Sequence, residues 1–229
     1  MYVSPYMRTM QTLYELGMTL GTDRILGVRE EPRIREQDFG NFQDTGMTKL
    51  KRERAGFGRF FFRFPNGESA ADVYDRVTSF RETLRNDIDF GRFACERLGC
   101  TTDDCTVIIV THGLTLRVFL MRWYKWTTEM FDRLHNPGNA ELVVMERGAG
   151  GRYSLLNFHQ DENALRKFGF TEAMVNDQRW AQEAPVDALN PDWLTSRGAE
   201  FFDTFGDRLE GCRRAVKRAD AYFEKGQND

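Results

Sequence analysis

A run of β-branched residues that ends at a histidine-glycine pair constrains this chain more than any other feature. Residues 106–111 are all threonine, valine or isoleucine, and His112, Gly113 and a helical apolar pattern over residues 114–124 follow. The pattern predicts a strand that delivers His112 to the N-terminus of a helix. First-turn N–H groups have no internal partners and carry the positive end of the helix dipole, so we expect a phosphoryl group to bind beside His112 and Gly113. A polar residue at a strand end is also common in α/β proteins, so a purely structural explanation stays open for this segment alone.

The start of the chain offers a second anion-binding group. Tyr2 and Val3 predict the end of a strand, and Ser4 followed by Pro5 has the pattern of a helix N-cap with proline at the first helical position. Arg8 lies one turn into this helix, on the face that Ser4 shares. Because a guanidinium can donate two parallel hydrogen bonds to a phosphate, Arg8 is a candidate phosphate-binding residue.

A carboxylate further along the chain is the candidate proton donor. Glu36 lies between the apolar Ile34 and a turn at Gly40. If Glu36 is partly buried, its pKa rises, and it can serve as a general acid.

These three segments, in this order, resemble the histidine phosphatase superfamily, the phosphoglycerate-mutase-like phosphohydrolases. In that family a strand-His-Gly-helix element holds the second catalytic histidine, a Ser-Pro-x-x-Arg element binds phosphate, and an acidic proton donor precedes a glycine turn. His112, Arg8 and Glu36 match these three elements. The resemblance is closest to the plant and fungal subgroup and covers essentially the whole chain, through residues 34–42, 59–65, 174–180 and 201–205.

A further segment looks like the Pro-x-Gly-Glu-Ser helix start of the same family. It spans residues 64–73, and Arg76 lies beyond it. Ser69, with Asp72 three residues later, predicts a capping box at the start of a helix.

The chain departs from the family at its defining motif. The family nucleophile is the histidine of an Arg-His-Gly sequence at the end of the first strand, and this sequence contains no Arg-His-Gly. Its other histidines, His135 and His159, follow no first strand, and we expect neither to replace the nucleophile. We expect the family's opening strand, loop and helix, on the order of 30 residues, to be missing through an incomplete sequence or a real loss. The missing strand would lie beside the His112 strand, so unpaired backbone groups are expected at that edge.

The resemblance implies an α/β fold, a three-layer sandwich with a mainly parallel central sheet. We expect a truncated phosphatase-like domain over residues 1–159 and a helical C-terminal extension over residues 160–229 that packs on the same domain. In an intact family member it implies phosphomonoester hydrolysis through a phosphohistidine, with phosphatase action favoured over mutase action. His112 and Glu36 would be catalytic, Arg8 and Gly113 would bind phosphate, and neither a metal nor an organic cofactor would be required.

Two hypotheses about function remain, and only the nucleophile separates them. The first is a phosphatase that acts on a small phosphorylated substrate and releases inorganic phosphate. The alternative is a catalytically silent structural or assembly subunit that binds a protein partner.

Composition excludes several other classes. The chain has 229 residues, 41% of them hydrophobic, which is enough for one large core, and its net charge of -3 argues against nonspecific nucleic-acid binding. No apolar run approaches the roughly 20 residues that cross a bilayer. The four cysteines form no CxxC pair, so we expect reduced thiols in an intracellular protein of undetermined compartment.

The remaining pattern alternates strands and helices. We expect a helix over residues 69–90 and an amphipathic helix over residues 207–225. Short extended segments are expected over residues 24–29 and 32–35, and strands over residues 140–146 and 152–158. Residues 47–64 form a basic segment rich in phenylalanine, and we expect most of it to be a solvated, amphipathic insertion. The family resemblance implies that it lies over or beside the phosphate pocket, with one or two cations facing an anionic substrate. An RNA-binding explanation of this segment is weaker, because no RNA-binding motif accompanies it.

Overall fold

The computed structural model describes residues 1–40, 54, 57–93, 99–188 and 210. They fall into two compact units, of which the first comprises residues 1–145 and 155–178 and the second comprises residues 146–154 and 179–229. All of the candidate site residues belong to the first unit. The domain division after residue 159 stays a prediction.

A parallel sheet organises the first unit. Its strands are β1 (Tyr2–Val3), β2 (Arg29–Glu30) and β3 (Ile109–Val110), in the order β2-β1-β3. Tyr2 pairs with Arg29 on one side and with Ile109 on the other. β3, the His112 strand, pairs with β1 on one side and is the last strand of this order among the described residues. The expectation of unpaired backbone groups at its other edge stays a prediction. The fold is the α/β fold with a parallel central sheet that the sequence predicted.

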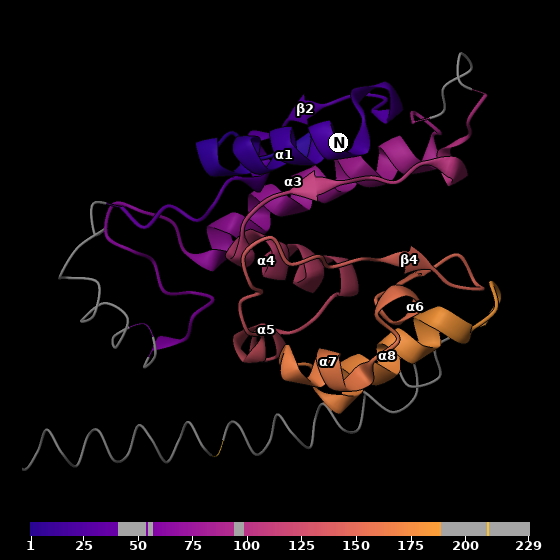
Figure 1. Cartoon of the computed structure of the whole chain (residues 1–229). Coiled ribbons are helices and arrows are strands. Elements are labelled where there is room, and N and C mark those ends of the chain that lie inside the picture. Colours follow the sequence, from indigo (N-terminus) through magenta and orange to yellow (C-terminus); the bar gives the residue numbers. More distant parts are fainter. Residues whose placement is uncertain (41–53, 55–56, 94–98, 189–209, 211–229) are drawn as a thin grey trace, which may run out of the picture. The chain divides into compact units, whose positions relative to one another are not determined.

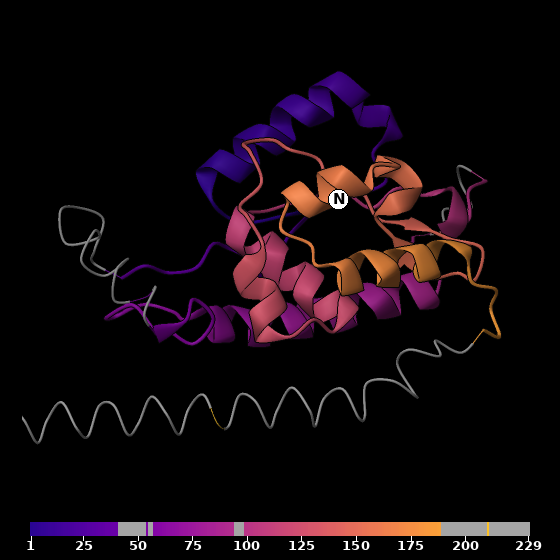
Figure 2. The same cartoon turned by 90° about the horizontal axis from the view of Figure 1, so that it is seen from below.

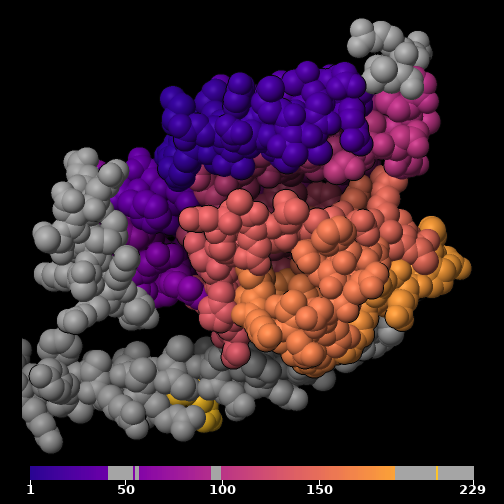
Figure 3. Space-filling model, viewed as in Figure 1, coloured from indigo at the N-terminus to yellow at the C-terminus, as the bar shows by residue number. Residues whose placement is uncertain are grey.

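Helices cover this sheet. The helix α1 (Met7–Leu20) contacts β1 and β3, whereas α3 (Ala70–Asp89) packs along α4 (Gly113–Tyr124) (Figure 1). Figure 2 shows α1 apart from the α3–α4 pair. The ring of Tyr2 on β1 meets Phe80 of α3 edge-on at 5.3 Å. Figure 3 shows α1, in indigo, as a solvent-exposed ridge.

The core of the first unit lies between α3 and α4. Fully buried apolar side chains recur along α3 at helical spacing and meet those of α4, among them Val73, Val77, Phe80, Val118 and Leu120. Burial of each such side chain is worth about 1.5–3 kcal/mol, so this packing fixes α4, and with it His112.

The start of α3 confirms the predicted capping box. The Ser69 side chain accepts from the N–H of Asp72, while the Asp72 carboxylate accepts from the N–H of Ser69. The predicted cap of the first helix was wrong. Tyr6, not Ser4, is the N-cap of α1, and its side chain makes no cap bond. The Ser4 hydroxyl contacts His112 instead.

Two predicted extended segments contain helical turns. Residues 32–34 form the 3₁₀ turn η2 (Pro32–Ile34), because Pro32 favours a first helical position and Glu31 accepts from the N–H of Arg33. Residues 156–159 form α6 (Leu156–His159), so the strand expected over residues 152–158 is confirmed only at β5 (Tyr153–Ser154). A short apolar run does not distinguish a buried strand from a buried helical turn.

The strand expected over residues 140–146 was wrong except at its last residue, where β4 (Glu146–Arg147) pairs antiparallel with β5. The remaining elements with described bounds are η1 (Thr22–Arg24), η4 (Thr102–Asp104), α5 (Thr128–Arg133), α7 (Glu162–Lys167) and α8 (Glu172–Glu183). The helix predicted over residues 207–225 lies outside the described residues apart from Glu210. Among the helices that the structure describes, none has the length and apolar character to cross a membrane.

Candidate active site

His112 lies at the junction of β3 and α4, as the sequence predicted. It is the N-cap of α4, with extended backbone (φ -124°, ψ 159°) and no side-chain cap bond, so its ring is available for other contacts. Gly113 follows as the first helical residue. A Cβ at Gly113 would lie 2.7 Å from the Asn136 side chain, which explains why glycine suits this close approach.

Two hydrogen bonds determine where the proton of His112 resides. Its Nδ1 lies 2.8 Å from Arg8 Nη2, and its Nε2 lies 2.7 Å from Ser4 Oγ. A guanidinium only donates, so Nδ1 accepts, and the ring proton is on Nε2, which donates to Ser4. Burial first, and then the charges of Arg8 and Arg76, lower the pKa of His112 to about 4. The imidazole is therefore neutral at pH 7.

Arg8 reaches His112 from the first turn of α1. Its guanidinium lies 4.8 Å from the centre of the Tyr6 ring, and the same ring meets His112 edge-on at 5.0 Å. The aromatic contact orients the cation toward the imidazole. The structure thus brings together two residues that are 104 positions apart in the sequence.

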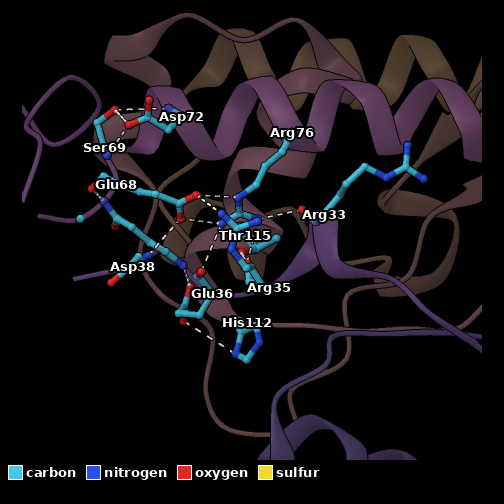
Figure 4. Close-up of polar contacts among 12 residues, drawn as sticks. Arg33, Arg35, Glu36, Asp38, Glu68, Ser69, Asp72, Arg76, His112 and Thr115 are labelled. Carbon is cyan, nitrogen blue, oxygen red and sulfur yellow. Dashed lines mark hydrogen bonds and ion pairs between the residues drawn. The ribbon is translucent and has the colours of Figure 1, made fainter. Parts of the chain in front are cut away.

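Glu36 faces the same position. Its Oε2 lies 3.9 Å from His112 Nδ1 (Figure 4), and its side chain is 18% exposed. Burial raises the pKa of Glu36, although the Gln37 N–H and the charges of Arg8, Arg117 and Arg76 act in the opposite direction. A carboxyl group that holds its proton closer to neutral pH has the property that a general acid needs.

The backbone that carries Glu36 is held by Arg76 of α3. Arg76 donates to the carbonyl oxygens of Arg33 (2.7 Å), Arg35 (2.9 Å) and Glu36 (3.1 Å) (Figure 4). Its Nε and Nη2 also donate to Glu68, at 3.1 and 3.0 Å. Arg76 therefore fixes three backbone carbonyl groups of the Glu36 loop to one helix.

Glu68 completes this support. It accepts from Arg76, from the guanidinium of Arg35 and from the N–H of Asp38, and its side chain is 14% exposed. The sequence pointed to the segment that contains Glu68 and Arg76 but not to this role. The role of Glu68 depends on burial of its ion pair with Arg76 and on contacts with residues about 30 to 40 positions away along the chain. Such contacts leave no local sequence pattern from which this role could be inferred.

The site is suited to an oxyanion rather than to a cation. Arg8, the N-terminal turn of α4 and the carboxyl ends of parallel strands converge on it, an arrangement that binds phosphoryl groups in α/β proteins. Within the described ranges, no group of three His, Cys, Asp or Glu side chains is placed to hold a metal ion. Fold and site together define an α/β protein with a candidate anion site and a candidate acid beside it.

Comparison with known proteins gives the family. The model of the histidine phosphatase superfamily (branch 1) matches residues 1–159, and the chain belongs to this superfamily. It is 49% identical over 212 residues to the phosphoglycerate mutase-like protein AT74 of Arabidopsis thaliana, covering 92% of this chain and 65% of that protein. It is 52% identical over 120 residues to the broad-range acid phosphatase DET1 of Saccharomyces cerevisiae, covering 52% of this chain and 34% of the yeast protein. The chain thus spans less than two thirds of the length of either relative.

Among solved structures, a mycobacterial glucosyl-3-phosphoglycerate phosphatase in complex with inorganic phosphate is similar to this chain. The two are 23% identical, with a TM-score of 0.48 and coverage of 61% of this chain and 65% of that one.

Proposed function

We propose that this chain carries the anion-binding and acid–base half of a phosphomonoesterase site that works through a phosphohistidine. The observation that carries the proposal is the convergence of Arg8, His112 and Glu36 at one edge of the sheet. The broad-range acid phosphatase among the relatives supports phosphatase action over mutase action.

Each residue has a role that follows from its position. Arg8 and the Gly113 N–H hold the non-bridging oxygens of the phosphoryl group and stabilise their charge in the transition state. His112 accepts from Arg8 and so orients that guanidinium toward them. Glu36 gives its proton to the ester oxygen as the P–O bond breaks. In the second step it takes a proton from the water that attacks phosphorus and breaks the P–N bond, which restores the nucleophilic histidine.

The nucleophilic histidine of the family has no counterpart in the sequence of this chain. The 229 residues contain no Arg-His-Gly, so we expect this polypeptide to bind phosphate or vanadate but to turn over little substrate. Loss of a covalent nucleophile in a comparable hydrolase lowers turnover by about a millionfold. If no such histidine is supplied, the second candidate function applies, a catalytically silent subunit whose anion site binds a ligand or a protein partner.

Two assays on an aryl phosphate test this proposal. The polypeptide is compared with a fusion that carries an Arg-His-Gly strand of a family member ahead of Met1. We expect turnover only in the fusion, and we expect Arg8→Ala to weaken phosphate binding in both forms. Turnover by the unmodified chain that disappears in His112→Ala would mean that His112 is itself the attacking residue, and the assignment of roles would be wrong.

A further inference from the structure

Two threonine hydroxyl groups reach from the β3–α4 junction to the loop that carries Glu36. Thr111, which follows β3, donates from Oγ1 to the carbonyl oxygen of Ile34 at 2.7 Å. Thr115, in the first turn of α4, donates from Oγ1 to the carbonyl oxygen of Arg35 at 2.8 Å (Figure 4). The two threonines thus connect the Glu36 loop to both sides of the junction.

The carbonyl groups of residues 33–36 all accept hydrogen bonds from side chains. Arg76 bonds three of these groups, Thr111 bonds the remaining one, and Thr115 is a second donor to the carbonyl group of residue 35. Because Arg76 belongs to α3, it ties the loop to that helix. The threonines tie the same loop to the elements that hold His112, through bonds in which Arg76 takes no part.

The hydroxyl of Thr115 is used differently from those further along the helices. Threonine hydroxyls there donate to the carbonyl oxygen four residues earlier, as in Thr12, Thr19, Thr78 and Thr83. The residue four before Thr115 precedes His112, the N-cap, so the hydroxyl of Thr115 reaches another element instead. The side chain is buried, with the residue 1% exposed, so this bond is shielded from competing water.

These bonds act on the separation between the candidate acid and the anion position. Glu36 Oε2 lies 3.9 Å from His112 Nδ1, the atom that also accepts from Arg8. A general acid must lie within hydrogen-bond reach of the oxygen that it protonates, and a misplacement of about 1 Å can lower a rate about a hundredfold. Bonds between the backbone of the Glu36 loop and the β3–α4 junction restrain this separation directly.

We propose that Thr111 and Thr115 are positioning residues, which set the separation between Glu36 and the phosphoryl group. The inference rests on the proposed function, which gives Glu36 the role of proton donor. Both hydroxyl groups act through the backbone of the Glu36 loop and contact no substrate. Arg8 and the Gly113 N–H hold the phosphoryl group, so loss of either hydroxyl displaces the acid and leaves anion binding intact.

Thr115→Val and Thr111→Val test this role, because each removes one hydroxyl and keeps a branched side chain. Thr115→Val leaves the carbonyl group of Arg35 bonded to Arg76, so no acceptor is orphaned. The full chain is titrated by ¹³C NMR of the Glu36 carboxyl group and by calorimetry with inorganic phosphate. We expect the pKa of Glu36 to fall toward its ordinary value in both variants, because burial raises it and a displaced loop admits water. The dissociation constant for phosphate should stay within about twofold of the wild-type value.

Two further variants separate positioning from general loosening of the fold. Thr115→Ser keeps the hydroxyl, so the pKa of Glu36 should stay at the wild-type value. The matched control is Thr78→Val in α3, whose hydroxyl donates to the carbonyl oxygen of Tyr74 at 2.8 Å and accepts from Arg122 at 3.0 Å. This control loses two hydrogen bonds that do not involve the Glu36 loop, and it should leave the pKa of Glu36 unchanged.

The outcomes for the threonines and for the proposed function are distinct. An unchanged pKa of Glu36 in both valine variants of Thr111 and Thr115, or an equal shift in Thr78→Val, overturns the positioning role while the proposed function stands. Loss of phosphate binding in the valine variants of Thr111 and Thr115 also overturns it, because the hydroxyls would then act on the anion site. A wild-type chain that binds phosphate no better than Arg8→Ala contradicts the proposed function, and the titration of Glu36 still decides whether the threonines hold its loop.

Discussion

At the residue scale, the chemistry of the site depends on the protonation of one imidazole. Arg8 can only donate to His112, so the ring is held as the neutral tautomer with its proton directed at Ser4. The sequence identified His112 and Arg8 from the junctions between strands and helices. It did not identify the role of Ser4, because its position before a proline is equally typical of a helix cap.

Ser4→Ala tests this tautomer. The change removes the acceptor of a buried N–H, so we expect the free energy of unfolding to fall by about 1–3 kcal/mol. The ¹⁵N chemical shifts of the ring should show a neutral Nε2–H imidazole in the wild type at pH 7 and a loss of the fixed tautomer in the variant. Thr12→Ala, which removes an exposed hydroxyl bonded within α1, is the control and should change stability by less than about 0.5 kcal/mol. A cationic His112 in the wild type at pH 7 would contradict the assignment.

At the element scale, α3 does more than contribute to the core. Its start was predictable, because the Ser69 and Asp72 capping box is a local pattern with a local cause. Its connection to the Glu36 loop was not, because Arg76 meets carbonyl oxygens 40 to 43 residues away. Sequence patterns report the contacts within an element, whereas the contacts between elements depend on how the chain packs.

A double-mutant cycle on Arg76 and Glu68 measures this connection. Both side chains are largely buried, at 11% and 14% exposure, so removal of one leaves the other charge without its partner. We expect Arg76→Met to lower the free energy of unfolding by about 3 kcal/mol, and the coupling with Glu68→Gln to be about 1–3 kcal/mol.

The control cycle uses Arg85 and Asp89, an exposed pair on the same helix. Its coupling should not exceed about 0.5 kcal/mol. Equal coupling in the two cycles would show that Arg76 does not fix the loop. In a form of the protein with phosphatase activity, Arg76→Met should also shift the basic limb of the pH dependence of kcat/KM, because it displaces Glu36, which must hold its proton in the first step.

At the scale of the whole molecule, the order of the strands was the least predictable feature. The sequence gives strands that end at Ser4 and His112, yet their direct pairing follows only from the assembled sheet, where Ser4 N–H donates to the carbonyl oxygen of Val110 at 3.0 Å. The strands predicted over residues 140–146 and 152–158 are confirmed only in part, because apolar composition alone does not select a backbone conformation.

The pH dependence of stability tests the buried site as a whole. The pKa of His112 falls from 6.5 to about 4 on folding, so between these values the unfolded chain binds a proton that the folded chain excludes. The free energy of unfolding should therefore decrease as the pH falls from 6.5 toward 4, by about 3 kcal/mol in total from this residue. The contribution of Glu36 to the pH dependence of stability has the opposite sign. Its raised pKa means that the folded chain takes up a proton first, which stabilises the fold as the pH falls and offsets part of the loss.

Urea unfolding at pH 7.0 and 5.0, in buffers without phosphate, separates the two contributions. His112→Asn should remove most of the difference between the two pH values, because the imidazole whose pKa falls on folding is gone. Glu36→Gln should enlarge the difference, because the offsetting proton uptake is lost. Equal differences in the wild type and in His112→Asn would show that His112 is not held neutral by the fold. The donation from Arg8 to His112 Nδ1, on which the neutral tautomer rests, would then be contradicted as well.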